Sequence, residues 1–148
     1  MSRATLIHAA KINDQVGPLG ASMSMNYMAV GLPALGAVLQ GAGHDVELLH
    51  LGVQHKVEPD WDLETHIRKQ SPDVVGFSLH WHPQSWDTIQ AVRAVRRGAP
   101  KAFIVLGGFT ASAMHEDILR TVPEVDGVIR GDGEKALVKR AKLNVDLN

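Results

Sequence analysis

Three short segments of the sequence carry the residues that could do chemistry, and each follows an apolar run. Residues 76–83, GFSLHWHP, end one run with small residues and then offer a hydroxyl and two imidazoles. Gly107-Gly108 follows the next run, and Gly131-Asp132-Gly133-Glu134 follows the last. Glycines let the backbone approach a bulky ligand, and free N–H groups before a helix can bind a polar or phosphate group. A tight strand-to-helix turn explains each glycine segment equally simply.

Histidine is abundant, with eight residues in the chain. His80 and His82 alternate, so they would share a face of an extended segment, where a metal site is conceivable. No third ligand stands nearby, and the other six histidines look scattered. The sequence also contains no cysteine, which excludes a disulfide, a cysteine-based zinc site, an iron–sulfur cluster and a cysteine nucleophile within this chain.

Composition favours one ordinary domain. The chain has 148 residues with a formal net charge of -1, and no basic stripe suggests nucleic acid or an anionic membrane as a partner. We expect Arg93, Arg96 and Arg97 to be solvated at the end of a helix. No apolar run approaches the ~20 residues of a membrane span, and the first residues lack a signal peptide pattern. A cytoplasmic protein is the default expectation.

Strands and helices alternate along the sequence. The apolar runs predict five strands, at 5–10, 46–51, 73–79, 102–106 and 125–130. Helical spacing predicts a helix over 32–40, one capped by Asp60, one capped by Ser85, one opened by Thr110 or Ser112, and one from about Asp132 to Lys142. This order predicts an α/β fold with a five-stranded, doubly wound parallel sheet of flavodoxin-like order 2-1-3-4-5. Ligands of such sheets bind beyond the carboxyl ends of the strands, at the switch point between the first and third strands.

The segment from Lys11 to Val30 is an unusually long irregular connection, and it leaves the first strand at that switch point. Long loops in compact domains are usually functional or disordered, and its position favours a role in covering a ligand. The sequence lacks G-x-G-x-x-G after the first strand, a Walker A motif and G-x-S-x-G. Those absences argue against a dinucleotide site, a nucleoside-triphosphate site and an α/β-hydrolase.

Taken together, four segments resemble the cobalamin-binding domain, most closely the form found N-terminal to radical S-adenosylmethionine (SAM) domains. They are GLPALGAVLQGAGHDVELL (31–49), SPDVVGFSL (71–79), IVLGGFTASAMHEDIL (104–119) and VDGVIRGDGEKAL (125–137). The resemblance implies a corrin ring over the carboxyl edge of the sheet and a nucleotide tail in a slot lined by small residues. Ser78, Gly107 and Gly108 match the positions that line that slot, and Gly131 and Glu134 match the turn after the fifth strand.

The resemblance also implies that the 11–30 loop and the His80–Pro83 loop contact the ring. The predicted cofactor-binding residues are Asn13, Gly17, Ser78, Leu79, His80, Trp81, Gly107, Gly108, Phe109, Thr110, Gly131 and Glu134. No residue of this chain is predicted to be catalytic.

The sequence departs from other cobalamin proteins in two places. The mutase and methionine-synthase subgroups carry Asp-x-His-x-x-Gly after the first strand, where the histidine ligates cobalt, whereas residues 11–17 here read KINDQVG. Leu79 follows Ser78 directly, without the usual intervening residue. Both departures suit the radical SAM subgroup, and they imply base-off cobalamin without a protein histidine ligand, although His80 or His82 could still approach the cobalt.

The chemistry of that subgroup needs a further domain. SAM and a 4Fe-4S cluster belong to a radical SAM catalytic domain, which would lie in the same chain or another one. We expect residues 1–137 to form the cobalamin-binding domain and 138–148 to be a tail or the start of a linker. The alternatives are a flavin- or nucleotide-binding domain of the same architecture, a small enzyme using His80, His82 and Asp14, and a ligand-free regulatory domain.

Overall fold

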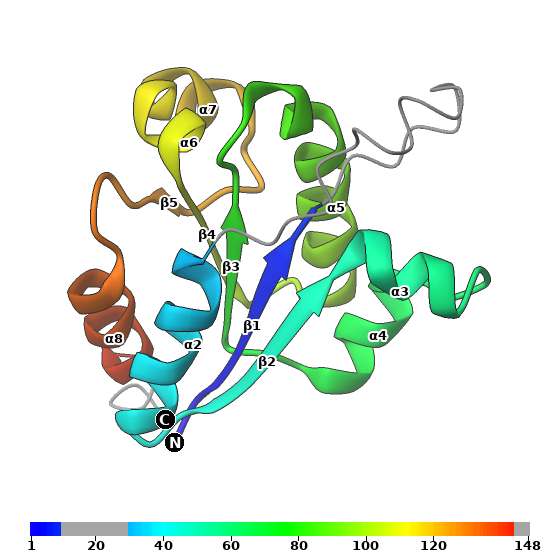
Figure 1. The fold of residues 1–148 in the computed structure, drawn as a ribbon, viewed down its shortest axis with the longest axis horizontal. Helices are drawn as coiled ribbons and strands as arrows, with labels where there is room; N and C mark the ends of the chain where they lie inside the picture. Colours follow the sequence, from blue (N-terminus) through cyan, green and yellow to red (C-terminus); the bar gives the residue numbers. More distant parts are fainter. Residues whose placement is uncertain (10–29, 144–148) are drawn as a thin grey trace.

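The five predicted apolar runs form five parallel strands. The computed structural model describes residues 1–9 and 30–143. The strands are β1 (Arg3–His8), β2 (Asp45–His50), β3 (Val74–Ser78), β4 (Phe103–Gly107) and β5 (Gly127–Val128). They pair in parallel in the order β2-β1-β3-β4-β5, which confirms the predicted fold class and topology (Figure 1).

Seven α-helices lie within the described residues. They are α2 (Gly31–Gly41), α3 (Leu51–Val57), α4 (Leu63–Gln70), α5 (Ser85–Gly98), α6 (Phe109–Ala113), α7 (His115–Thr121) and α8 (Glu134–Leu143). A short 3-10 turn over His82–Gln84 precedes α5. None of the described helices is long and apolar enough to cross a membrane.

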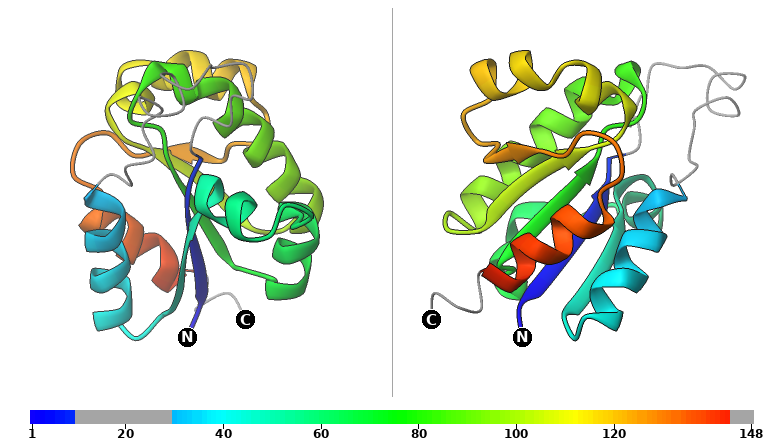
Figure 2. Two further views of the ribbon diagram at one scale, coloured as in Figure 1. Left: turned by 45° about the vertical axis from the view of Figure 1, so that its right-hand side comes forward. Right: turned by 90° about the vertical axis from the view of Figure 1, so that its left-hand side faces the viewer.

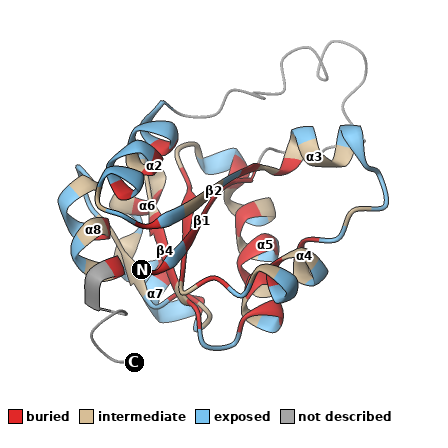
Figure 3. Cartoon of the chain, turned by 90° about the horizontal axis from the view of Figure 1, so that it is seen from below, coloured by how far each residue is buried: buried red, intermediate tan, exposed pale blue. Residues whose placement is uncertain are grey.

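The helices cover both faces of the sheet, so the core has two parts. Side chains alternate along a strand, which sends Leu6 and Ile7 of β1 to opposite faces. Leu6 packs with α2 and α8, whereas Ile7 packs with α4 and α5. Figures 1 and 2 show these two helical layers, and Figure 3 shows the buried residues gathered on the strands and on the inward helix faces. This double covering explains why the central strands read as continuous apolar runs.

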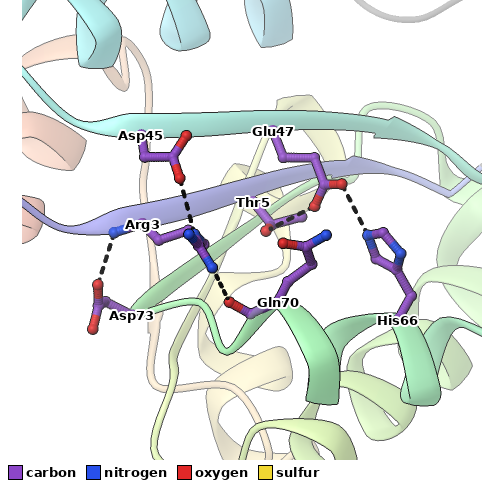
Figure 4. Close-up of polar contacts among 7 residues, drawn as sticks. All are labelled: Arg3, Thr5, Asp45, Glu47, His66, Gln70 and Asp73. Carbon is purple, nitrogen blue, oxygen red and sulfur yellow. Dashed lines mark hydrogen bonds and ion pairs between the residues drawn. The ribbon is translucent and has the colours of Figure 1, made fainter.

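Charged residues position β1 and β2 against the helix α4 that follows them. The guanidinium of Arg3 donates to Asp45 at 2.9 Å and to the carbonyl of Gln70 at 2.6 Å. The carboxylate of Glu47 contacts His66 of α4 at 2.9 Å (Figure 4). These contacts lie on the face of the sheet that α4 covers, away from the glycine-containing segments near the carboxyl ends of β3, β4 and β5.

Several predicted boundaries are corrected by side-chain hydrogen bonds. Asp62 caps α4 in place of the predicted Asp60, because its carboxylate accepts the Thr65 N–H at 2.8 Å. Hydrogen bonding from the Thr65 side chain, together with this backbone bond, holds the pKa of Asp62 below its ordinary value. Ser85 is the first residue of α5, and its hydroxyl donates to the carbonyl of His82 at 2.7 Å instead of capping the helix.

Helix α3 is an addition to the predicted elements, because the apolar pattern places Leu51 at the end of a strand. His50 is the last residue of β2, and its imidazole caps α3 by accepting the Val53 N–H at 3.2 Å. Only Leu51 of this short helix is buried, so the sequence carries no helical period of apolar residues there.

The predicted fourth helix is two helices, α6 and α7, that meet at Met114. Gly108 precedes α6, whereas Thr110 and Ser112 lie inside it. The fifth strand is shorter than predicted and has two residues. The carboxylate of Asp126, which precedes it, accepts the Ile104 N–H of β4 at 2.7 Å.

The expected division between residues 137 and 138 lies within α8. This helix continues to Leu143, and Ala141 is fully buried against the core. The division between domain and tail stays a prediction. Most of the 11–30 loop, with Asn13 and Gly17, lies outside the described residues.

Candidate functional site

A slot opens at the carboxyl edge of the sheet, between the strands and the helices α2 and α8. Its volume is about 270 Å³. Apolar side chains of β1, β4, α2 and α8 form its walls, and polar residues of the loops stand at its mouth. The side chains and glycines that matter below are Leu6, Leu32, Leu35, Gly76, Ser78, His80, Val105, Gly107, Asp132, Glu134 and Leu137.

Strand register arranges part of this lining in two rows. His8, Ser78 and Gly107 are paired across β1, β3 and β4, at the carboxyl ends of the strands, and Ser78 and Gly107 of this outer row line the slot. Two residues earlier, Leu6, Gly76 and Val105 form the next row on the same face. Two residues of a strand rise about 7 Å, so the second row lies roughly that far inside the slot.

Missing side chains keep the slot open. A Cβ built at Gly107 would meet no atom within 4 Å, so a larger residue there would extend into the slot; Gly131 also has open space, but its φ of +73° favours glycine. Gly108 is needed for a different reason: its φ is +110°, and a Cβ there would lie 2.7 Å from the carbonyl oxygen of Leu79. Gly107 therefore shapes the space, whereas Gly108 shapes the turn between β4 and α6.

The structure brings half of the predicted site residues to the slot. The residues that line it are Ser78, His80, Gly107, Gly108, Gly131 and Glu134. The remaining described members of the set, which do not line it, are Leu79, Trp81, Phe109 and Thr110. The assignment of all these residues to cofactor binding stays a prediction.

Two of the four residues outside the slot hold its loops in place. Leu79 is buried in the other part of the core, and its N–H donates to the carbonyl of Gly107 at 2.8 Å. The hydroxyl of Thr110 donates to the carbonyl of His80 at 3.0 Å. Both bonds join the β3 loop to the β4 loop at the carboxyl edge.

Aromatic rings gather at this edge beside the slot. The ring of His80 lies 5.0 Å from that of Trp81 and 6.1 Å from that of Phe109, measured between centroids. Phe109 is 77% exposed although it is large and apolar. These rings offer a broad apolar surface to a flat ligand lying over the strand ends.

The histidines are less scattered than the sequence suggested. His8 and His50 end neighbouring strands in register, and their ring centroids are 4.8 Å apart. Burial lowers the pKa of His8 to about 4, helped by the nearby imidazoles of His50 and His80. His82 is exposed on a 3-10 turn and does not share an extended face with His80. Among the described residues, no three His, Asp or Glu side chains are placed to hold a metal ion.

Sequence reasoning missed the inner lining of the slot. The sequence presents Gly76 only as a small residue in a strand, and Leu32, Leu35 and Leu137 only as helical core positions. The alternation of side chains along β3 could have identified Gly76 as part of the slot, because Gly76 lies two residues before Ser78 and therefore on the same face of the sheet. The leucines of the helices carried no such signal, because helix residues that line a slot and helix residues of a core have the same apolar spacing.

A family model described as the B12 binding domain matches residues 17–141, most of the chain. This chain belongs to the B12-binding domain family. Cobalamin is accordingly the cofactor of this domain, and the resemblance drawn from the sequence is confirmed.

Relatives of known activity contain this domain as a small part. The hopanoid C-3 methylase of Methylococcus capsulatus is 32% identical over 111 residues, which are 74% of this chain and 21% of that protein. The anaerobic magnesium-protoporphyrin IX monomethyl ester cyclase of Cereibacter sphaeroides is 30% identical over 80 residues, 54% of this chain and 13% of that protein. The chain therefore spans about a fifth or less of the length of these relatives.

A solved structure shares the fold. The radical S-adenosylmethionine methyltransferase TsrM from Kitasatospora setae, with its tryptophan substrate and a SAM analogue bound, superposes with a TM-score of 0.76. The match covers 99% of this chain and 26% of that one, at 21% sequence identity. This likeness concerns the fold.

The residues of this B12-binding domain fit cobalamin. The open space beside Gly107 is a cradle that a side chain there would fill. The inner walls are apolar, and the carboxylates of Asp132 and Glu134 at the mouth can accept hydrogen bonds from amide and hydroxyl groups. Corrin amides and ribose hydroxyls are donors of that kind.

Proposed function

We propose that this B12-binding domain carries cobalamin for a radical SAM catalytic domain, in the same chain or another one, within a methyltransferase-like enzyme. The hopanoid C-3 methylase, which is similar over 74% of this chain, supports the class of parent enzyme. SAM and a 4Fe-4S cluster belong to the catalytic domain in this proposal, because this chain has no cysteine for a cluster. Cobalamin, when bound, supplies a cobalt centre that can carry a methyl group.

The single observation that supports base-off binding is the slot itself. Its inner row lies roughly 7 Å from the carboxyl ends of the strands, so a nucleotide tail that enters it must leave the cobalt above the sheet. Ser78 stands at the outer row, where its hydroxyl can bond the polar part of the tail. The predicted residues Ser78, Gly107, Gly108, Gly131 and Glu134 would hold the tail, and His80, Trp81 and Phe109 would contact the ring.

The proposal assigns no histidine to the cobalt. Residues 11–17, after β1, contain no histidine where the mutase and methionine-synthase subgroups have their cobalt ligand. The protein then supplies placement: the slot holds the tail, the aromatic edge supports one face of the ring, and the other face stays accessible to a partner domain. Asn13 and Gly17 remain candidate ring contacts in the loop.

A flavin- or nucleotide-binding function is not favoured. A terminal phosphate needs cations or a cradle of free N–H groups. The described residues that line the slot include the carboxylates of Asp132 and Glu134 but no lysine or arginine. Two carboxylates at the mouth would repel a doubly charged phosphate.

The visible absorption spectrum tests the proposal. The purified protein is incubated with hydroxocobalamin, desalted and scanned. We expect corrinoid bands to remain, with the shift to shorter wavelength that accompanies loss of the base from cobalt. Gly107→Trp should abolish retention, because the indole would fill open space in the slot.

Gly41→Trp is the matched control. Gly41 also has no atom within 4 Å of a built Cβ, but it lies at the exposed far end of α2. It should retain cobalamin like the wild type. Loss of corrinoid from the folded wild-type protein, or equal retention by both variants, would count against the proposed site.

A further inference from the structure

Polarity changes along the slot from its mouth to its inner end. The polar side chains of the described lining belong to Ser78 in the outer row, to His80 and Asp132 in the loops beyond the strands, and to Glu134 at the first residue of α8. The inner row contributes Leu6 and Val105, which are 0% and 5% exposed. The strand backbone between them is already bonded within the sheet.

The walls opposite the inner row are equally apolar. Leu32 and Leu35 of α2 and Leu137 of α8 face the sheet across the slot. Leu6 lies flat over Gly76, because a Cβ at Gly76 would be 2.8 Å from its Cδ2 atom. In the described lining, the inner end therefore offers aliphatic surface and no hydrogen-bonding side chain.

We propose that this inner end selects the base of the corrinoid tail, favouring an apolar methylated benzimidazole over a purine. The inference rests on the proposed function, since it requires the tail to enter the slot. A purine would bury ring nitrogens and an exocyclic amine against Leu6, Val105 and Leu137 without partners. Burying such groups unpaired costs enough to reduce affinity about tenfold to a hundredfold.

The test measures how strongly each protein variant prefers cobalamin over the same corrinoid carrying adenine as its base. The two dissociation constants are measured by quenching of tryptophan fluorescence, and their ratio is the preference. The free energy needed to detach each base from cobalt belongs to the free corrinoid. It therefore cancels when the preferences of two variants are compared.

Val105→Thr keeps the shape of the side chain and places a hydroxyl in the inner row. We expect it to shift the preference toward the adenine form by about threefold to tenfold, the range of one added hydrogen bond. Val75→Thr is the matched control, because Val75 is buried in β3 on the opposite face of the sheet. It should lower stability in the same way and leave the preference unchanged.

A second variant covers the case in which Val105→Thr does not fold. Leu35 lines the slot from α2 at a half-buried position, so Leu35→Gln places an amide there with little strain. It should shift the preference in the same direction. An unchanged preference in the folded slot variants, measured against Val75→Thr, overturns the inference.

Cobinamide, which has the corrin ring without the nucleotide, separates this inference from the proposed function. Tighter binding of both complete corrinoids than of cobinamide supports a tail in the slot. If cobinamide binds as tightly as cobalamin, the tail does not use the slot, and the proposed tail site fails together with the selection of the base. If both complete corrinoids bind more tightly but the slot variants leave the preference unchanged, only the selection of the base fails.

Discussion

At the scale of single residues, His8 combines complete burial with a titratable ring. It ends β1, is 0% exposed, and its Nδ1 has no hydrogen-bond partner among the described residues. Its Nε2 lies 3.4 Å from the amide nitrogen of Gln84, which suits a neutral ring that accepts a bond there. A charged ring at this position would lose its hydration and face two other imidazoles, so the pKa is lowered to about 4.

This lowered pKa predicts acid sensitivity. The unfolded chain protonates His8 near the ordinary histidine pKa of 6.5, whereas the folded chain resists protonation until about pH 4. The free energy of unfolding should therefore fall as the pH drops through this window, by about 3 kcal/mol from His8 alone. Urea denaturation of the wild type and of His8→Leu at pH 7, 5.5 and 4 measures the difference.

The quantity to compare is how the difference in unfolding free energy between the wild type and His8→Leu changes with pH, and not the size of that difference at one pH. His82→Gln, which removes an exposed histidine, serves as the control and should follow the wild type. A constant difference between the wild type and His8→Leu from pH 7 to 4 would show that His8 is not the sensitive group.

At the scale of elements, Arg96 joins α5 to the segments that precede β4 and β5. Its guanidinium donates to the carbonyls of Ala102 at 2.9 Å and Glu124 at 2.7 Å, and to the carboxylate of Asp126 at 2.6 Å. The prediction of a solvated arginine cluster is wrong for this residue. Arg97 fits that prediction better, because its side chain is 61% exposed although it pairs with Glu64.

We expect Arg96→Lys to destabilise the fold by about 2 kcal/mol, because an ammonium cannot reproduce the planar fork that serves several acceptors at once. Arg97→Lys should change stability by no more than about 0.5 kcal/mol, as expected of an exposed ion pair. Urea denaturation with an unchanged m-value would measure both effects. Equal effects of the two substitutions would contradict this account of Arg96.

At the scale of the whole molecule, the slot lies between the sheet and two helices from opposite ends of the chain. Helix α2 follows the first strand and α8 follows the last, yet they pack side by side on one face (Figure 1). A ligand there contacts both helices and three strands. Its binding should therefore stabilise the domain as a unit.

Thermal unfolding with cobalamin tests this coupling. At a free cobalamin concentration a hundred times the dissociation constant, the native state gains about 2.7 kcal/mol. For a domain of this size, that raises the midpoint of thermal unfolding by roughly 5–10 °C. Gly107→Trp should show almost no rise, and a rise equal to that of the wild type would place the ligand elsewhere.

Much of the candidate site could be predicted from the sequence because parallel strands end at a common edge. Ser78, Gly107 and Gly131 follow three different apolar runs, and the predicted strand order brings them together. The inner lining could not be predicted, because the leucines of α2 and α8 that form it have the same spacing as helix residues of any core. Helix α3 was also missed, because its cap is the imidazole of His50 rather than one of the usual capping residues.

The sequence by itself determined the class of fold, the strand order, and the places of Ser78 and Gly107 at the carboxyl edge. These follow from local signals: hydrophobic period, glycine position and the order of segments along the chain. The family came from the resemblance of four segments to the cobalamin-binding domain. Only the tertiary structure decided that Leu6, Gly76 and Val105 form an inner row, that Gly107 opens space while Gly108 serves a turn, and that His8 lies beside His50 and near His80. Those features depend on strand register and on the packing of distant helices, which neighbouring residues in the sequence do not encode.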